Sequence, residues 1–121
     1  MPNWPSRREE HRQVFAGASD IPIHFETGLT TIELTGELDL AAHDELEAVC
    51  ALAIDFAAPV KVDVSGVSFM DSTGVAFLAQ LVGAGYAYGW RPVVVGANRR
   101  VREAIELAGL HHSLDLAEPS P

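Results

Sequence analysis

The sequence predicts an α/β domain, built as a mixed β-sheet with helices packed on it. Short apolar segments with the periods of strands and helices follow one another in the order ββ, α, β, α, β, α and an end piece. Such alternation is typical of a mixed sheet covered by helices. The chain has 121 residues, 48% of them hydrophobic and 21% charged, which is enough for one domain with a single core.

The first elements are predicted to form a β-hairpin. Apolar residues alternate with Pro22 and His24 over residues 21–25, and alternate again over residues 30–35, with a Thr27-Gly28 turn between the two runs. Alternation on both sides of a turn indicates paired strands that are buried on one face. Proline cannot donate to a ladder, so Pro22 indicates an edge position or the start of a strand.

A helix is predicted next, with Asp39 as its N-cap and Pro59 just beyond its end. Apolar residues at three- and four-residue spacing mark its inward face. They are Leu46, Val49, Cys50, Ala53 and Phe56 or Ala57. The single cysteine cannot form an internal disulfide, which fits a reducing compartment, and we interpret it as a small apolar residue of this face.

The second half of the chain is predicted to add two strands and two helices. Residues 60–64 form a short strand, and a strand-and-loop segment to Met70 precedes a helix over residues 75–88. Its predicted inward residues are Val75, Leu78, Leu81 and Val82, with Ala76 and Phe77 extending the apolar surface.

After Gly89 ends that helix, Val93–Val95 is predicted as a buried strand, and Asn98 caps a helix over residues 99–108. Its inward residues are Val101, Ile105 and Leu107 or Ala108. Residues 110–116 form a final strand or a short turn.

The domain is predicted to span residues 20–117, between a flexible arm over residues 1–19 and a tail over residues 118–121. The arm is polar, contains prolines and has room for a short helix over residues 9–15. It lacks the apolar stretch of a signal peptide, and no run in the chain approaches the ~20 apolar residues of a membrane span. These observations predict a cytoplasmic protein without membrane association.

The formal net charge is −9, although Arg7, Arg8 and Arg12 lie in the arm, so the domain is more acidic than the whole chain. Nucleic-acid binding requires a basic footprint. We therefore expect no nucleic-acid partner.

The segment Asp71-Ser72-Thr73-Gly74 is the candidate functional site because it stands where a strand hands over to a helix. Free N–H groups and the helix dipole favour negative charge at such a position, so a phosphate on Ser72 would meet donors, with Asp71 partly opposing it. Capping of the helix alone explains the same residues, and it is what Asp, Ser and Thr usually do at a helix start. The local sequence does not separate the two interpretations.

Two longer segments carry a resemblance to a known family. Residues 64–75, VSGVSFMDSTGV, and residues 34–39, LTGELD, resemble in order and separation two signature blocks of the STAS domain family, the anti-sigma factor antagonists. Val93–Val95, Val101 and residues 108–110 fall where that family has its last main strand and following helix. One departure is Gly89-Trp90-Arg91-Pro92, which stands where the family often has a Gly-Gly turn.

The resemblance implies a STAS-like mixed β-sheet of about four to five strands with helices mainly on one side. It also implies an anti-sigma factor antagonist, not an enzyme, that regulates sigma-factor-dependent transcription by partner switching. Unphosphorylated, such a protein binds a kinase-like anti-sigma factor; phosphorylation of Ser72 releases that partner, and a phosphatase resets the switch. The alternative is a non-switching STAS scaffold or a ligand-sensing subunit of a signalling or transport assembly.

By the same resemblance, Ser72 is the phosphoacceptor and Thr73 the second choice. The partner-binding surface comprises Asp39, Asp71, Ser72, Thr73 and Gly74. We expect no cofactor, metal or catalytic residue. His111-His112 lacks an acidic or cysteine partner at metal-ligand spacing, and the glycines of residues 83–89 lie at a helix end, where close packing and a helix stop explain them better than phosphate binding.

Overall fold

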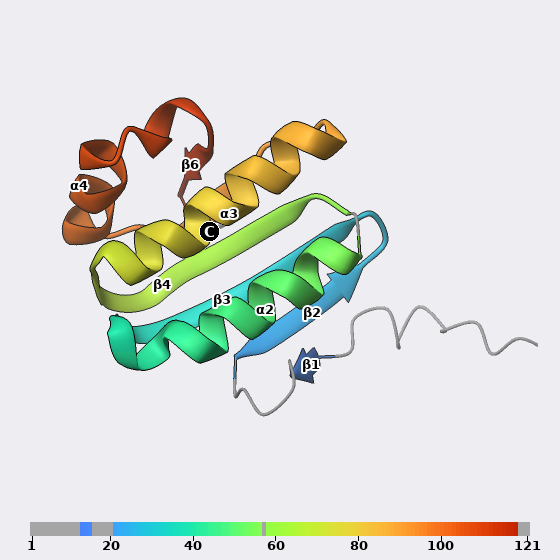
Figure 1. Ribbon diagram of the computed structural model, residues 1–121, viewed down its shortest axis with the longest axis horizontal. Coiled ribbons are helices and arrows are strands. Elements are labelled where there is room, and N and C mark those ends of the chain that lie inside the picture. Colours follow the sequence, from blue (N-terminus) through green and yellow to red (C-terminus); the bar gives the residue numbers. More distant parts are fainter. Residues whose placement is uncertain (1–12, 16–20, 57, 119–121) are drawn as a thin grey trace, which may run out of the picture.

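The computed structural model describes residues 13–15, 21–56 and 58–118 and forms one six-stranded sheet in the order β1-β2-β3-β4-β5-β6 (Figure 1). The strands are β1 (Gln13–Phe15), β2 (Pro22–Glu26), β3 (Leu29–Leu38), β4 (Val60–Met70), β5 (Val93–Val95) and β6 (Asp115–Ala117). The pairs β1–β2 and β2–β3 are antiparallel, whereas β3 to β6 pair in parallel.

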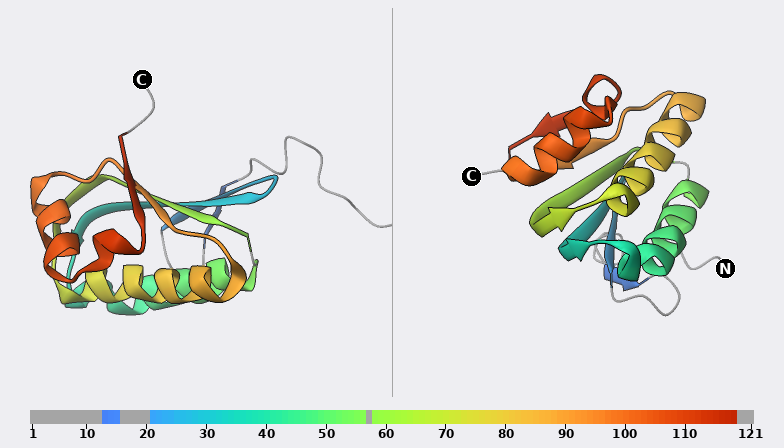
Figure 2. Two further views of the ribbon diagram at one scale, coloured as in Figure 1. Left: turned by 90° about the horizontal axis from the view of Figure 1, so that it is seen from above. Right: turned by 60° about the vertical axis from the view of Figure 1, so that its left-hand side comes forward.

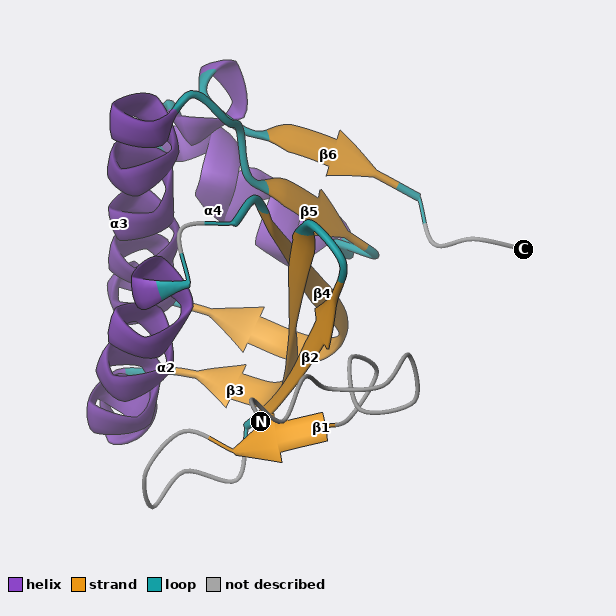
Figure 3. Ribbon diagram, turned by 90° about the vertical axis from the view of Figure 1, so that its right-hand side faces the viewer, coloured by secondary structure: helices purple, strands orange, loops and turns teal. Residues whose placement is uncertain are grey.

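The helices cover one face of this sheet and leave the other open (Figures 2 and 3). They are α2 (His43–Asp55), α3 (Ser72–Tyr88) and α4 (Arg99–Leu107), with short 3₁₀ turns η1 (Leu40–Ala42) and η2 (Leu110–His112). The predicted α/β class with a mixed sheet and helices on one side is confirmed. Over the described residues, none of the helices has the length and apolar character that crossing a bilayer demands.

The sixth strand is β1, which lies in the segment predicted as the arm. Residues 13–15 pair with β2, where the sequence left room for a short helix over residues 9–15. Pro22 lies opposite Phe15, so it marks the start of β2 and not an outer edge of the sheet. The rest of the predicted arm, residues 1–12 and 16–19, and the tail beyond Glu118 lie outside the described residues.

Strand β4 continues to Met70, where the sequence indicated a strand over residues 60–64 and then a looser segment. Between Glu33 and Thr35, and again between Gly36 and Glu37, its register with β3 shifts by one residue, each time with the extra residue in β4. Such β-bulges interrupt the two-residue period of a strand. The buried positions are accordingly Val60, Val62, Val64, Val67 and Met70, so the alternation fails while the strand persists.

The core lies between the sheet and the three helices. Its strand residues include Ile23, Ile32, Leu34, Val62, Val64 and Val94, and its helix residues include Leu46, Val49, Cys50, Ala53, Leu78, Leu81, Val101 and Ile105. Phe56 is 49% exposed and packs on the Phe25 ring, with centroids 4.2 Å apart. Ala57 is outside the described residues.

The inward faces of α3 and α4 differ partly from the predicted ones. On α3, Phe77 is fully part of the core, whereas Val75 and Val82 are half-buried at its margins and Ala76 is exposed. On α4, both Leu107, at 90% exposure, and Ala108 face solvent. An α-helix turns about 100° per residue, so Leu107 points roughly opposite to the buried Ile105.

Candidate functional site

The predicted site residues lie at the edge of the sheet where β3 and β4 end side by side. The last residues of these parallel strands, Leu38 and Met70, are register partners. Each is followed by an aspartate, and the backbone N–H of Asp71 donates to the carbonyl of Leu38 at 3.1 Å. Asp39 and Asp71, 32 positions apart in the sequence, therefore stand next to each other at this edge.

Both aspartates hold backbone N–H groups at the start of helical segments. Asp71 has extended backbone angles, and its carboxylate accepts from the Thr73 N–H at 2.7 Å, which makes it the N-cap of α3. Asp39 accepts from the Ala41 N–H at 3.0 Å. It thereby caps the 3₁₀ turn η1, whereas the sequence predicted that it caps the long helix directly. The N-cap of α2 is Ala42, which makes no side-chain capping bond.

Ser72 is the first residue of α3, and its side chain is exposed. Within the described part of the chain, its hydroxyl has no hydrogen-bond partner, and the capping bond is made by Asp71. A helix start also favours a negative charge at this position. The hydroxyl is thus accessible to a modifying partner, and the capping that the sequence proposed for the whole turn is performed by Asp71 alone.

Thr73 and Gly74 are turned inward by comparison. Thr73 is half-buried and lines a small crevice of about 40 Å³ between α2 and α3. Gly74 is buried; a β-carbon there would lie 2.5 Å from Met70 Cγ and 3.1 Å from Leu38 Cβ. Glycine therefore allows the first turn of α3 to press against the ends of β3 and β4. Of the two hydroxyl-bearing residues, Ser72 is the more accessible.

Two exposed apolar side chains lie next to this site and were not singled out from the sequence. Leu40 follows Asp39 and is 76% exposed, and Phe69, two residues before Asp71, is 39% exposed. We name the surface formed by Leu40, Phe69, Asp39, Asp71 and Ser72 the switch surface. A signal for Leu40 was present, since it lies six residues before Leu46 and so out of phase with the buried stripe of α2.

Helix α4 is fastened to the same end of β4 by Asn98. Its amide group donates to the Val67 carbonyl at 2.8 Å, and its side-chain oxygen accepts from the Val101 N–H at 2.9 Å. The predicted N-cap is thus confirmed. In addition, the hydrogen bond from Asn98 to the Val67 carbonyl holds α4 against the bulged part of β4, the strand that leads to Ser72.

The glycines near the end of α3 have the structural role that the sequence favoured. Gly89 has a left-handed backbone with φ of 87° and ends the helix. Gly85 is buried against Trp90, and a β-carbon there would collide with the backbone and ring of that residue. Trp90 therefore covers the edge of the core at the departure from the family's usual turn.

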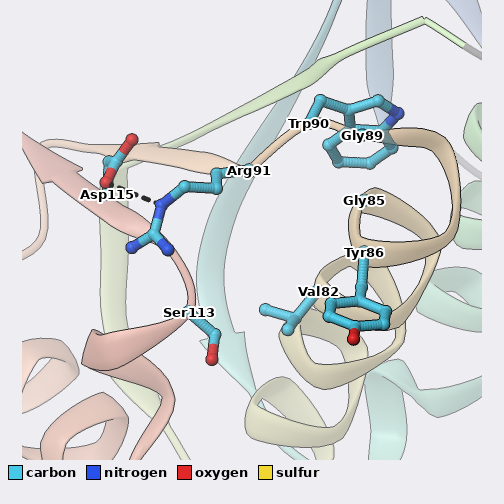
Figure 4. A pocket seen from close by; sticks show the side chains of 8 residues that line it. All are labelled: Val82, Gly85, Tyr86, Gly89, Trp90, Arg91, Ser113 and Asp115. Atoms are coloured by element: carbon cyan, nitrogen blue, oxygen red, sulfur yellow. Dashed lines mark hydrogen bonds and ion pairs between the residues drawn. The ribbon is translucent and has the colours of Figure 1, made fainter.

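A surface hollow of about 690 Å³ lies beside this turn. Figure 4 shows Tyr86 and Val82 of α3 on one wall and Arg91, Ser113 and Asp115 on the other. Arg91 donates to Asp115 at 3.2 Å and to the carbonyl of His112 at 3.1 Å, so its charge is already paired. We assign no ligand to this hollow.

His111 and His112 stack on each other, with ring centroids 4.0 Å apart, and both are exposed, as expected for a solvated turn. In the described part of the chain, the atoms of His43, Asp44 and Glu47 lie close enough to suit a metal. All three side chains are exposed, and the two ring nitrogens of His43 face different carboxylates, at 3.2 and 3.6 Å. We interpret this group as surface ion pairs of α2.

The arrangement is that of an α/β domain that displays an exposed serine at the start of a helix. The family model described as Mlab, STAS domain, matches residues 24–118. The chain therefore belongs to the STAS domain family, as its two sequence blocks predicted. A search of curated proteins finds no significant match.

Solved structures show the same fold. An anti-sigma factor antagonist from Mycobacterium paratuberculosis is 24% identical, with a TM-score of 0.72 over 83% of this chain and 85% of that one. The anti-sigma factor antagonist SpoIIAA in its unphosphorylated form is 24% identical, with a TM-score of 0.65 over 83% of this chain and 88% of that one. SpoIIAA from Bacillus has also been solved in the phosphorylated form. SLC26A9 is 20% identical with a TM-score of 0.56, over 83% of this chain but 20% of that one.

Proposed function

We propose that this STAS domain is an anti-sigma factor antagonist that works by partner switching at Ser72. Unphosphorylated, it binds a kinase-like anti-sigma factor and so frees a sigma factor for transcription; phosphorylated on Ser72, it releases that partner until a phosphatase removes the phosphate. The observation that carries the proposal is the exposed, unpartnered Ser72 hydroxyl at the start of α3. Its support from known proteins is that structures of the same fold include anti-sigma factor antagonists, one of them solved in both phosphorylation states.

The geometry supplies a physical reason for release. A phosphate adds a charge of about −1.5 to −2. Here it would stand next to Asp71 in the chain, at the edge of the sheet that also carries the exposed side chains of Leu40 and Phe69. In the free protein, water and the start of α3 stabilise that charge. In a complex centred on Leu40 and Phe69, the phosphate would lose its water, so partner binding weakens while the fold is kept.

Phosphoryl transfer is tested by incubating the protein with a candidate anti-sigma kinase and ATP, followed by intact mass and peptide mapping. We expect one added phosphate on the wild type and on Thr73→Val, and none on Ser72→Ala. Thr73 is half-buried and is therefore the second choice as acceptor. A phosphate on Ser72→Ala but not on Thr73→Val would reverse the order of the two acceptors.

The binding surface is tested separately by titrating the anti-sigma factor with unmodified protein. Leu40→Ala removes an exposed apolar side chain of the switch surface, and we expect binding to weaken about tenfold, as for an interface anchor. Leu107→Ala is the matched control, since this leucine is exposed on α4 outside that surface. Equal effects of the two variants would remove the switch surface from the proposal.

A second candidate function is a non-switching scaffold or ligand-sensing subunit of a signalling or transport assembly. It is supported by the likeness to SLC26A9, of which this chain covers 20%. In that case, Ser72→Ala and Ser72→Glu would bind partners as the wild type does. Loss of binding with Ser72→Glu alone separates the two functions.

A further inference from the structure

The helices of the described residues lie on one side of the sheet (Figure 3). Charged side chains line a hollow on the opposite face. This hollow of about 610 Å³ crosses β2 to β6. Its polar lining comes from His24, Glu26, Thr31, Glu33, Lys61, Asp63 and Glu118. We name this surface the open face; it lies on the other side of the sheet from the core.

Negative charge predominates on the open face. Glu26, Glu33, Asp63 and Glu118 supply four carboxylates, against the single ammonium group of Lys61. Arg102 reaches Glu118 at 2.8 Å, whereas the carboxylates of Glu33 and Asp63 still outnumber Lys61. His24 lies 3.2 Å from the Glu33 carboxylate and adds a positive charge only when protonated. A basic segment would therefore complement this face.

The chain itself supplies such a segment directly beside the open face. Arg7, Arg8 and Arg12 precede β1. The first residue of β1, Gln13, is the register partner of His24, and the same row continues through Thr31 to Lys61. The chain thus enters the sheet at the level of the open-face residues.

The length of the segment matches the distance it must cross. Strands are spaced about 4.8 Å apart, so Glu33 and Asp63 lie roughly 10 and 14 Å from β1 across the sheet. Along the strands they are level with Phe15, so the segment before Gln13 has to turn back by about 7 Å to meet them. An extended chain spans about 3.4 Å per residue, which lets Arg8 reach about 17 Å from Gln13. Glu9 and Glu10 lie between the arginines in sequence, and Lys61 offers them an opposite charge.

We propose that residues 1–12 dock across the open face of their own chain, with Arg7 and Arg8 against Glu33 and Asp63. A tethered segment has an effective concentration in the millimolar range. It therefore outcompetes a separate basic partner of similar chemistry unless that partner is abundant or binds more tightly. The open face is thus a docking surface for a basic segment, and its resident occupant is the N-terminus.

Paramagnetic relaxation in the full-length protein tests this contact. A spin label is attached at Ser6→Cys; Cys50 is buried at 1% exposure, so the introduced thiol reacts first. We expect the amide signals of Thr31, Glu33, Lys61 and Asp63 to lose at least half their intensity. Those of Gln80, exposed on α3 on the other side of the sheet, should keep theirs.

Charge exchange then tests the pairing. Glu33→Arg should restore the intensities, and adding Arg7→Glu and Arg8→Glu to that variant should bring the loss back. Glu106→Arg is the matched control: it makes the same charge change at an exposed position on α4 and should alter nothing.

Three outcomes would overturn the proposal. One is no selective loss on the open face of the wild type, and another is a loss that Glu33→Arg leaves unchanged. The third is found by mixing spin-labelled protein with isotope-labelled protein that carries no spin label. If the isotope-labelled protein loses the same signal intensity in this mixture, the occupant of the open face is a second copy. None of these results bears on phosphorylation of Ser72, so this proposal and the proposed function fail independently.

Discussion

Replacing Gly74 by alanine tests whether the start of α3 is pressed against the ends of β3 and β4. Two effects of opposite sign compete. Alanine is favoured over glycine in a helix by up to about 1 kcal/mol. Against this, the new β-carbon would lie 2.5 Å from Met70 Cγ and 3.1 Å from Leu38 Cβ, and overpacking of a core costs about 1–3 kcal/mol.

The packing cost is the larger effect, so Gly74→Ala should lower the free energy of unfolding by about 0–2 kcal/mol. Gly83→Ala is the matched control, because Gly83 is exposed in the same helix and a β-carbon there meets nothing within 4 Å. That variant should gain about 1 kcal/mol. The difference between the two variants, about 1–3 kcal/mol, isolates the contact with Met70 and Leu38.

Urea unfolding followed by circular dichroism measures both variants against the wild type. Thermal unfolding should agree, with a midpoint change of roughly 4–8 °C for each kcal/mol in a domain of this size. If Gly74→Ala stabilised the protein as much as Gly83→Ala does, the first turn of α3 would not be held by these contacts. Packing against Met70 and Leu38 would then not fix the backbone that carries Ser72.

Three further changes probe the capping residues and the core. Asp71→Ala should lower the free energy of unfolding by about 1 kcal/mol in urea titrations. Asp71→Asn keeps an acceptor for the Thr73 N–H and should lower it by only a few tenths of a kcal/mol. Equal losses in the two variants would contradict capping by Asp71. Asn98→Ala removes bonds to Val101 and Val67 and should cost about 2 kcal/mol by the same measurement, and a loss under 0.5 kcal/mol would show that neither bond matters. Burial, with a smaller effect of Glu47, raises the pKa of the Cys50 thiol to about 11 from its ordinary 9.0. Above pH 9 the unfolded chain therefore loses the thiol proton before the folded protein does. The free energy of unfolding should fall between pH 9 and 11 more in the wild type than in Cys50→Ala, by up to about 3 kcal/mol. Parallel pH profiles of the two proteins would refute this.

Local signals were sufficient to predict most elements of this fold. A cap residue acts within three positions of its own, so Asn98 could be recognised as an N-cap from the sequence alone. The same holds for Gly89, whose left-handed backbone ends α3. For the start of α3, the sequence indicated capping by the turn of residues 71–73 without separating Asp71 from its neighbours. The position of Ser72 between a strand and a helix follows from these signals as well.

Features that depend on a neighbouring strand were missed. The continuity of β4 to Met70 is set by its pairing with β3, and the two bulges remove the alternation by which a strand is recognised. Likewise, β1 forms because its backbone pairs with β2, and three residues are too short to show a period. The two register shifts cancel at Phe69, which faces outward as an unbroken alternation from Val60 would place it. It was missed because residues 65–70 were predicted as a looser segment.

The site residues divide in the same way. Gly74 was expected as part of a binding surface, yet it is buried and acts through packing, which only the contact with Leu38 and Met70 reveals. Asp39 was expected to cap a helix directly, but a 3₁₀ turn intervenes and carries Leu40 outward. Tertiary contacts thus decided which of the predicted site residues are exposed and which are buried.

The switch surface and the open face share strands β3 and β4 but are electrostatically separate at physiological salt. Glu33 precedes Leu38 by five residues on β3, which places the charge pairing of the open face about 17 Å from the edge that carries Ser72. The Debye length is about 8 Å at 0.15 M salt, so the field of a phosphate on Ser72 is largely screened at that distance. At 0.01 M salt that length rises to about 30 Å, and the two surfaces come within each other's field. In the proposed function, phosphorylation of Ser72 would therefore act on a bound partner through the local surface of Leu40, Phe69 and Asp71. The proposed docking of residues 1–12 would leave that action unchanged at physiological salt.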